Sequence, residues 1–216
     1  MIESITLTFD DTTYKLDLDS QINIITGKNH TNKSKLLEMI KLTVRDIIKS
    51  SEPSFPYDCK FTSLPKHILH LTSPSQMDIT ELIGKPSHVK TPHKTIVDLL
   101  LDNTLSKVNL SSVPYEIISG YIPDFNPKDI HTYSTGEKLL LNLLLMAATT
   151  GKERTLMLLD CVDGEFHPNW LDDWQNNLLE SILKINPNTQ IVMVTHSTEI
   201  ARYWSDYTCD IKRLVQ

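Results

Sequence analysis

The stretch "IITGKNHTNKSKLL", residues 24–37, decides which fold this sequence encodes. Gly27, Lys33 and Ser34 fit the pattern GxxxxGK[ST] of a phosphate-binding loop, and Asn32 stands where the pattern has its second glycine. In such a loop, backbone N–H groups and the start of the next helix face the phosphates, and the lysine neutralises their charge. We therefore expect a nucleotide phosphate site. Its expected residues are Gly27, Lys28, Asn29, His30, Thr31, Asn32, Lys33, Ser34 and Lys35.

Asn32 leaves two outcomes open for this loop. Asparagine tolerates the left-handed backbone region better than most residues other than glycine. If the loop needs only a positive φ at this position, it works with asparagine. If it needs a backbone without a side chain, the Cβ atom of Asn32 would crowd the phosphates and weaken binding.

The segments on either side of the loop have the strand-then-helix context that the motif requires. Residues 21–26 are a short β-branched run, and from Ser34 onward apolar residues recur at helical spacing. Residues 4–18 alternate polar and apolar around "DDTT", which predicts an antiparallel hairpin at the N-terminus.

The later part of the sequence alternates strand and helix patterns. Residues 67–73, 154–160 and 189–197 are apolar runs typical of strands, and residues 134–150 and 170–185 have helical patterns. Strands buried on both faces and separated by helices indicate an α/β fold with a mainly parallel central sheet.

The middle of the chain carries weaker patterns. Residues 77–133 contain several prolines and one predicted helix, over residues 94–105. We expect one domain over residues 1–216, with residues 77–133 as a mostly helical inserted lobe.

Two polar residues follow buried strands and are expected at the same edge of the sheet. Asp160 ends the run "LMLLD", and His196 follows "VMVT". Ligands of open α/β sheets collect at the carboxyl ends of the strands, where a carboxylate can hold Mg²⁺. The simpler interpretations are a turn residue that ends its strand and a hydrogen-bonded core histidine.

The segment "YSTGEK", residues 133–138, starts the helix predicted over residues 134–150. Ser134 and Glu137 have the spacing of an ordinary helix capping box, so a purely structural role is open at this point.

Taken in order, these four segments resemble ABC-type ATPases, in the branch with SMC and repair ATPase heads and the OLD-like ATPases of bacterial defence systems. "GKNHTNKSKLL" is similar to that branch's Walker A motif, "STGEK" to a shortened signature, "LMLLDCVDGEFHP" to its Walker B motif, and "VTHS" to its switch-histidine segment. The resemblance implies a P-loop NTPase fold of the ABC-ATPase type.

The resemblance also implies a role for each matching residue. Lys33 would contact the β- and γ-phosphates of ATP, and His196 would lie near the γ-phosphate. The implied Mg²⁺ residues are Ser34, Gln76 and Asp160. The implied signature residues, which would contact the nucleotide of a second subunit, are Ser134, Thr135, Gly136 and Glu137. A homodimer around sandwiched Mg-ATP is the expected assembly.

Cys161 is where the sequence departs from the family's pattern, which has a catalytic glutamate after the Walker B aspartate. A thiol is mostly protonated near neutral pH and is a weak hydrogen-bond acceptor. Asp163 or Glu165 could substitute from the next turn, or lie on an acidic surface loop. We therefore expect slow or impaired ATP hydrolysis, with His196, Cys161 and Asp163 as the catalytic candidates.

These inferences combine into an expected function. The chain should be an ATP-binding head that dimerises around Mg-ATP and acts as a switch or scaffold for a separate effector protein, in antiviral defence or DNA maintenance. One alternative is an interaction protein that has lost nucleotide turnover. The other is a DNA-binding ATPase subunit, suggested by the basic stretch "GKPSHVKTPHK" at residues 84–94.

Composition excludes several other classes of protein. The formal net charge of −6 gives no overall positive field for nucleic acid or an anionic membrane, so any such contact must be local. The longest apolar run, residues 139–148, is about half of what a membrane span needs. Three scattered cysteines and an N-terminus without a signal-peptide pattern predict a reduced, cytoplasmic protein.

Overall fold

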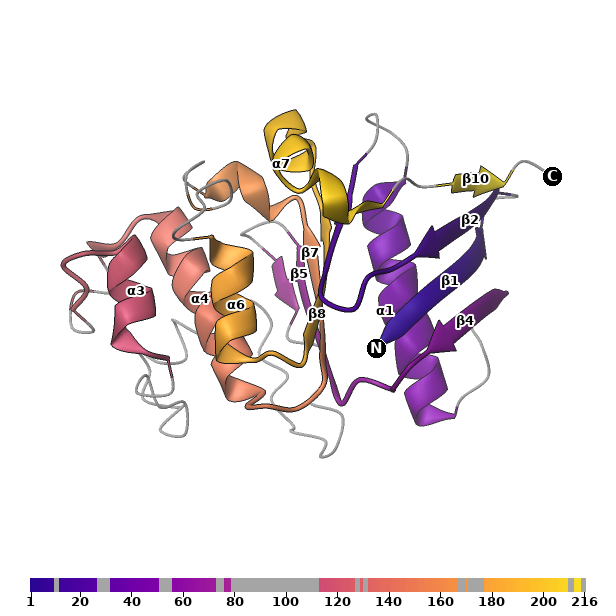
Figure 1. Cartoon of the computed structure of the whole chain (residues 1–216), viewed down its shortest axis with the longest axis horizontal. Coiled ribbons are helices and arrows are strands. Elements are labelled where there is room, and N and C mark those ends of the chain that lie inside the picture. Colours follow the sequence, from indigo (N-terminus) through magenta and orange to yellow (C-terminus); the bar gives the residue numbers. More distant parts are fainter. Residues whose placement is uncertain are drawn as a thin grey trace.

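The fold, seen in a computed structural model, is built from two β-sheets and the helices that pack on them (Figure 1). The structure describes residues 1–9, 12–26, 32–50, 56–72, 76–78, 113–126, 129, 132–166, 170, 177–209 and 212–214.

The smaller sheet is antiparallel and contains the predicted N-terminal hairpin. Its strands β1 (Ile2–Phe9), β2 (Thr12–Asp17), β4 (Tyr57–Phe61) and β10 (Lys212–Leu214) lie in the order β10-β2-β1-β4. The hairpin of β1 and β2 is confirmed. The sequence patterns did not predict β4, which pairs antiparallel with β1 on its other side.

The larger sheet has six strands and is mainly parallel, as predicted. Its strands lie in the order β6 (Gln76–Asp78), β5 (His67–Thr72), β7 (Thr155–Asp160), β8 (Thr189–Val194), β3 (Ile22–Ile25) and β9 (Thr208–Cys209). Only β6, an edge strand of this described sheet, runs antiparallel to its neighbour. Asp160 is in register with the last residues of both neighbouring strands, Thr72 and Val194. The carboxyl ends of the parallel strands therefore share one edge.

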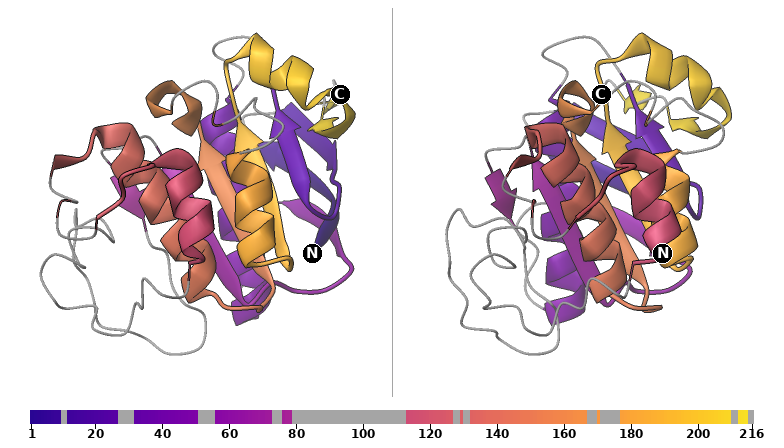
Figure 2. Two further views of the ribbon diagram at one scale, coloured as in Figure 1. Left: turned by 60° about the vertical axis from the view of Figure 1, so that its left-hand side comes forward. Right: turned by 90° about the vertical axis from the view of Figure 1, so that its left-hand side faces the viewer.

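Helix α1 (Lys33–Lys49) lies between the two sheets. Helices α3 (Tyr115–Tyr121), α4 (Thr135–Thr149) and α6 (Leu178–Ile185) cover the opposite face of the six-stranded sheet, as the turned views show (Figure 2). Helix α7 (Thr198–Tyr203) lies beyond the end of β8. Two short 3-10 helices, η3 (Val162–Glu165) and η4 (Ser205–Tyr207), complete the described elements.

Each central strand is buried on both faces, which explains the continuous apolar runs in the sequence. Along β7, Leu156 and Leu158 pack with α1 in one core, whereas Met157 and Leu159 pack with α4 and α6 in the other. All six residues of β7 are buried. A strand buried in this way needs apolar side chains on both faces, as expected for a parallel sheet covered by helices.

The segment of the expected inserted lobe is described in part. The predicted helix over residues 94–105 lies outside the described residues, while α3 was not predicted. Tyr121 of α3 is buried, and its hydroxyl lies 2.8 Å from the hydroxyl of Ser181 on α6. The end of this segment is thus packed into the core of the main domain. Residues 171–176, in the first half of the predicted helix 170–185, also lie outside the described part, and its second half forms α6.

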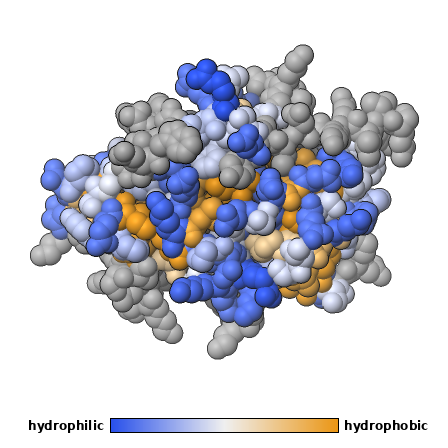
Figure 3. Space-filling view, viewed as in Figure 1, coloured by the Kyte–Doolittle hydropathy of each residue, from blue (hydrophilic) through white to orange (hydrophobic). Residues whose placement is uncertain are grey.

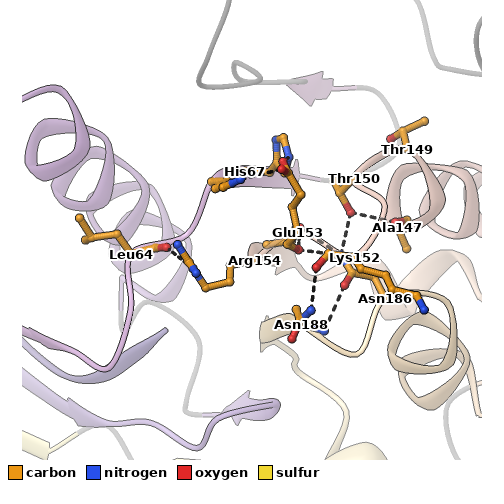
Figure 4. Close-up of polar contacts among 12 residues, drawn as sticks. Leu64, His67, Ala147, Thr149, Thr150, Lys152, Glu153, Arg154, Asn186 and Asn188 are labelled. Atoms are coloured by element: carbon orange, nitrogen blue, oxygen red, sulfur yellow. Dashed lines mark hydrogen bonds and ion pairs between the residues drawn. The ribbon is translucent and has the colours of Figure 1, made fainter.

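A network of polar contacts lies at the edge of the six-stranded sheet where its parallel strands begin, opposite their carboxyl ends (Figure 4). The side-chain amide of Asn186 donates to the hydroxyl groups of Thr150 and Thr155, at 2.9 and 3.3 Å, and to the carbonyl of Glu153 at 3.0 Å. The imidazole of His67 lies 2.7 Å from the carboxylate of Glu153. These contacts join the ends of α4 and α6 to the starts of β5 and β7, so we assign them a structural role.

The described surface is mostly hydrophilic on the face seen in Figure 3, with hydrophobic residues visible between the polar ones. Among the described large hydrophobic residues, the exposed ones are Leu64 and Tyr115. Within the part of the chain that the structure describes, no helix is long and apolar enough to cross a membrane.

Candidate nucleotide site

The candidate site lies where the parallel strands end and α1 begins, at the upper edge of the sheet in Figure 1. The strands β3, β7 and β8 are neighbours in the sheet and bring Ile25, Asp160 and Val194 into register there. Gly27, Lys28, Asn29, His30 and Thr31 lie outside the described residues.

Asn32 adopts the left-handed conformation that the missing glycine would take. Its backbone has φ 57° and ψ 27°, and it caps the start of α1, where its carbonyl accepts from the N–H of Leu36 at 2.9 Å. Its side chain makes no capping hydrogen bond. Asparagine is one of the few residues that visit this region routinely, so the loop's requirement for positive φ is met without glycine.

We predict that Asn32→Ala lowers the free energy of unfolding by about 1 kcal/mol, because alanine pays the left-handed penalty that asparagine largely escapes. The variant should also bind ATP more weakly, since the start of α1 would relax. Asn32→Gly is the matched control and should be at least as stable as the wild type. Chemical denaturation measures both, and equal stability of Asn32→Ala and wild type would contradict the prediction.

Ser34 and Asp160 are brought together although they lie far apart in the sequence. The hydroxyl of Ser34 donates to Oδ1 of Asp160 at 2.9 Å. Asp160 is 8% exposed, at the end of β7, whereas Ser34 lies exposed in the first turn of α1. A hydroxyl and a carboxylate at this spacing supply the hard oxygen ligands that Mg²⁺ prefers, so the pair fits that ion.

Lys33 is the first residue of α1 and is buried, with 4% of its surface exposed. Its neighbour Ser34 hydrogen-bonds to Asp160, which places the start of α1, and Lys33 with it, at the end of β7. A buried lysine at a helix N-terminus next to Ser34 is the arrangement that a phosphate site requires.

Cys161 follows Asp160 and has a left-handed backbone, with φ 52°. Its N–H donates to the carbonyl of Val194 at 3.0 Å, so its backbone is fixed against β8. Burial, together with the charge of Asp160 and a hydrogen bond to it, raises the pKa of the Cys161 thiol to about 12. The thiol is therefore protonated at neutral pH and cannot take a proton from water.

Asp163 and His196 lie at the same end of the sheet but in different surroundings. Oδ2 of Asp163 accepts a hydrogen bond from the Thr195 hydroxyl at 2.8 Å, and its Oδ1 is buried without a partner in the described structure. His196 is exposed, two residues beyond β8. The side chain of Glu165 lies outside the described part. Sequence patterns gave no reason to single out Thr195.

The signature-like segment forms the capping box that its spacing indicated. Oγ of Ser134 accepts from the N–H of Glu137 at 3.3 Å, and the Glu137 carboxylate accepts from the N–H of Ser134 at 2.7 Å. Thr135 is exposed and Gly136 is buried. In the described structure, the hydrogen bonds of the Ser134 and Glu137 side chains are those between these two residues.

Gln76, the third expected Mg²⁺ residue, begins β6 and pairs with Thr72 at the same edge of the sheet. Its side chain lies outside the described part, so only its backbone position is known. That position is two strands away from Asp160, since Thr72 of β5 lies between them in register with both.

Comparison with known proteins agrees with this fold. Residues 102–202 match the family described as "AAA domain, putative AbiEii toxin, Type IV TA system". A solved structure of an SMC head bound to the C-winged helix domain of ScpA is similar to the chain, with a TM-score of 0.56 and 13% identity over 99% of this chain and 97% of that one.

A second solved structure, the SMC head domain from Thermotoga maritima, has a TM-score of 0.52 and 14% identity, and the match covers 99% of this chain and 98% of that one. No curated protein matches the chain by sequence. Residues 102–202 thus resemble an AAA-type domain, and the chain as a whole has the α/β fold of an SMC head domain.

Proposed function

We propose that this protein is a cytoplasmic ATP-binding head that dimerises around Mg-ATP and hydrolyses it slowly or not at all. Its ATP state would act as a switch or scaffold for a separate effector protein. The observation that carries the proposal is the Ser34–Asp160 pair, 2.9 Å apart at the start of α1. Residues of Walker A and Walker B type that meet at one point favour a working nucleotide site over a decayed one.

Each described residue of the site has a task in this proposal. Lys33 would neutralise phosphate charge, aided by the N-terminus of the seventeen-residue helix α1. Ser34 and Asp160 would hold Mg²⁺, which when bound neutralises charge on the β- and γ-phosphates. His196 would lie near the γ-phosphate. The protonated Cys161 thiol supports slow hydrolysis, because it cannot act as the general base.

A partner protein and a defence role are supported by the similar proteins. One similar structure is an SMC head bound to a winged-helix domain of another protein, which supports a protein effector for this head. The matched family's description names a putative toxin of a type IV toxin–antitoxin system, which supports a place in defence. Both features are part of the proposal.

Size-exclusion chromatography with light scattering tests the proposal directly. We expect the molar mass to double when Mg-ATP is added and to stay that of a monomer with EDTA. Nucleotide extracted from the dimer peak should be mainly ATP. A chain that binds no nucleotide would overturn the proposal and favour an interaction protein that has lost its nucleotide.

We predict that Thr135→Arg leaves ATP binding intact and blocks the doubling of mass. Thr135 is exposed at the start of α4, so a long cation there would meet the second subunit while the capping box of Ser134 and Glu137 is kept. The buried neighbour Gly136 is a poorer choice, because an arginine there would also disturb folding. Lys138→Arg, a conservative change on the same turn, is the control. A Thr135→Arg protein that still doubles in mass would show that the segment serves only as a helix cap.

A further inference from the structure

Thr195 connects the three segments that form the candidate site. Its backbone N–H donates to the carbonyl of Ile25 at the end of β3, at 3.1 Å. Its hydroxyl donates to Oδ2 of Asp163 at 2.8 Å and accepts from the N–H of Ser197 at 2.9 Å. Thr195 is fully buried. One residue thus links the strand before the phosphate loop, the turn after Asp160 and the turn that carries His196.

His196 depends on its neighbours for its position. It is exposed, and its imidazole makes no hydrogen bond with the described residues, so side-chain packing does not fix it. The residues on both sides are fixed instead. Thr195 is held as described, and Ser197 caps α7, where its hydroxyl accepts from the N–H of Ile200 at 3.2 Å. The Thr195 hydroxyl, through its bond from Ser197, closes the turn around His196.

The hydrogen bond between the Thr195 hydroxyl and the Asp163 carboxylate belongs to the stronger class of protein hydrogen bonds. A hydroxyl that donates to a carboxylate makes a charge-assisted hydrogen bond, which is stronger than one between neutral groups. Because Oδ1 of Asp163 is buried without a partner in the described structure, Oδ2 carries that carboxylate's only hydrogen bond there. Removing the Thr195 hydroxyl would take away this hydrogen bond together with the one from the N–H of Ser197, so the turn around His196 would lose both of these contacts.

We propose that Thr195 is a positioning residue that, by bridging Asp163 and the backbone of Ser197, holds His196 in place for nucleotide turnover. This rests on the proposed function, because His196 is placed near the γ-phosphate only there. In this assignment Asp163 holds Thr195 and does not serve as the replacement for the missing glutamate.

Thr195→Val tests the proposal, because valine has nearly the shape of threonine and lacks the hydroxyl. Thr195→Ser keeps the hydroxyl and is the matched control. The first readout is the imidazole resonance of His196 in the nucleotide-free protein, assigned by its loss in His196→Gln. We expect it to move in Thr195→Val and to stay in place in Thr195→Ser.

The second readout is ATP turnover, followed in a single-turnover assay because the reaction is expected to be slow. In Thr195→Val the rate of the chemical step should fall about 10- to 100-fold, as misplacement of one group by about 1 Å does. ATP affinity should stay unchanged, and Thr195→Ser should turn over ATP as the wild type does.

Three results would overturn the proposal: a His196 resonance that stays in place in Thr195→Val, an unchanged rate of turnover, or a Thr195→Ser protein that behaves like Thr195→Val. If Thr195→Val does not fold, Asp163→Ala removes the same hydrogen bond from the other side, with Asp163→Asn as its control because the amide oxygen still accepts. A wild type that binds no ATP would instead refute the proposed function, and the resonance would still report on Thr195.

Discussion

Lys33→Ala is expected to abolish measurable ATP binding. Lys33 is buried at the start of α1, beside Ser34 and the end of β7. Because the position is buried, water cannot easily compensate the phosphate charge there once the ammonium group is removed. A hydrogen bond to a charged group contributes about 1.5–3 kcal/mol, and phosphate charge left uncompensated adds to the loss. The lost hydrogen bond alone lowers the affinity about tenfold to a hundredfold, since about 1.4 kcal/mol is a factor of ten. The uncompensated phosphate charge lowers it further, below what the titration detects. Calorimetric titration with Mg-ATP measures the change.

The control for this prediction lies on the same helix. Lys49 is in the last turn of α1, at the far end from the site, so Lys49→Ala should bind ATP as the wild type does. Thermal unfolding of both variants separates a loss of binding from a loss of folding. If Lys33→Ala and wild type bind ATP equally well, the assignment of the phosphate site to residues 27–35 is wrong.

The sequence predicted best those elements whose hydrophobic pattern follows directly from their burial in the core. The runs that became β7 and β8 are apolar along their central residues, because helices cover both faces of the sheet. By contrast, in β4 only every second residue faces the core, and the strand follows a proline-rich stretch. An alternation over only five residues was too short a pattern to predict a strand. Helix α3 is seven residues long and begins after Pro114, which gave an equally weak pattern.

The site was predictable in its location and less so in its geometry. The motifs located Ser34 and Asp160 at one edge of the sheet, since parallel strands end together, but only the fold brings their oxygen atoms to 2.9 Å. The sequence indicated only that asparagine tolerates the left-handed backbone that Asn32 adopts, and ATP binding tests whether its Cβ atom crowds the phosphates. Thr195 escaped notice because its importance comes from hydrogen bonds to Asp163 and Ile25, which lie in other segments of the sequence and are brought to it only by the fold.

The capping box shows why one pattern can serve two interpretations. The bonds between Ser134 and Glu137 account fully for this spacing within one chain. A role in a second subunit would use the exposed side of the same turn, where Thr135 lies. The structural role and the proposed contact in trans therefore do not exclude each other, and only the dimerisation experiment separates them.

Cys161→Glu is expected to raise ATP turnover by about 100- to 10,000-fold, the range that general-base and water-positioning groups contribute. The position is suited to such a group, because it directly follows Asp160, whose carboxylate meets Ser34 at the start of α1. Cysteine already has a left-handed backbone there, so a glutamate meets the same backbone penalty and the turn need not change. The charge of Asp160 would also raise the pKa of the new carboxylate, which makes it a better base near neutral pH.

Cys161→Gln is the matched control, since it has the size of glutamate but cannot accept a proton from water. It should turn over ATP no faster than the wild type. Phosphate release at saturating Mg-ATP measures the three proteins, and adding Lys33→Ala to Cys161→Glu excludes a contaminating ATPase. Faster turnover should also shorten the life of the ATP-held dimer, because the nucleotide that joins the subunits is consumed.

Two outcomes would count against this account of Cys161. A wild type already as fast as Cys161→Glu would mean that another group activates the water, and Glu165 would then be the first candidate because Asp163 is already bonded to Thr195. A Cys161→Glu protein that binds ATP normally and gains no activity would mean that another part of the site limits the reaction. In the expected case, hydrolysis is slow because the Cys161 thiol, with its pKa raised to about 12, cannot accept a proton from water. A glutamate at the same position then shortens the lifetime of the ATP-held dimer.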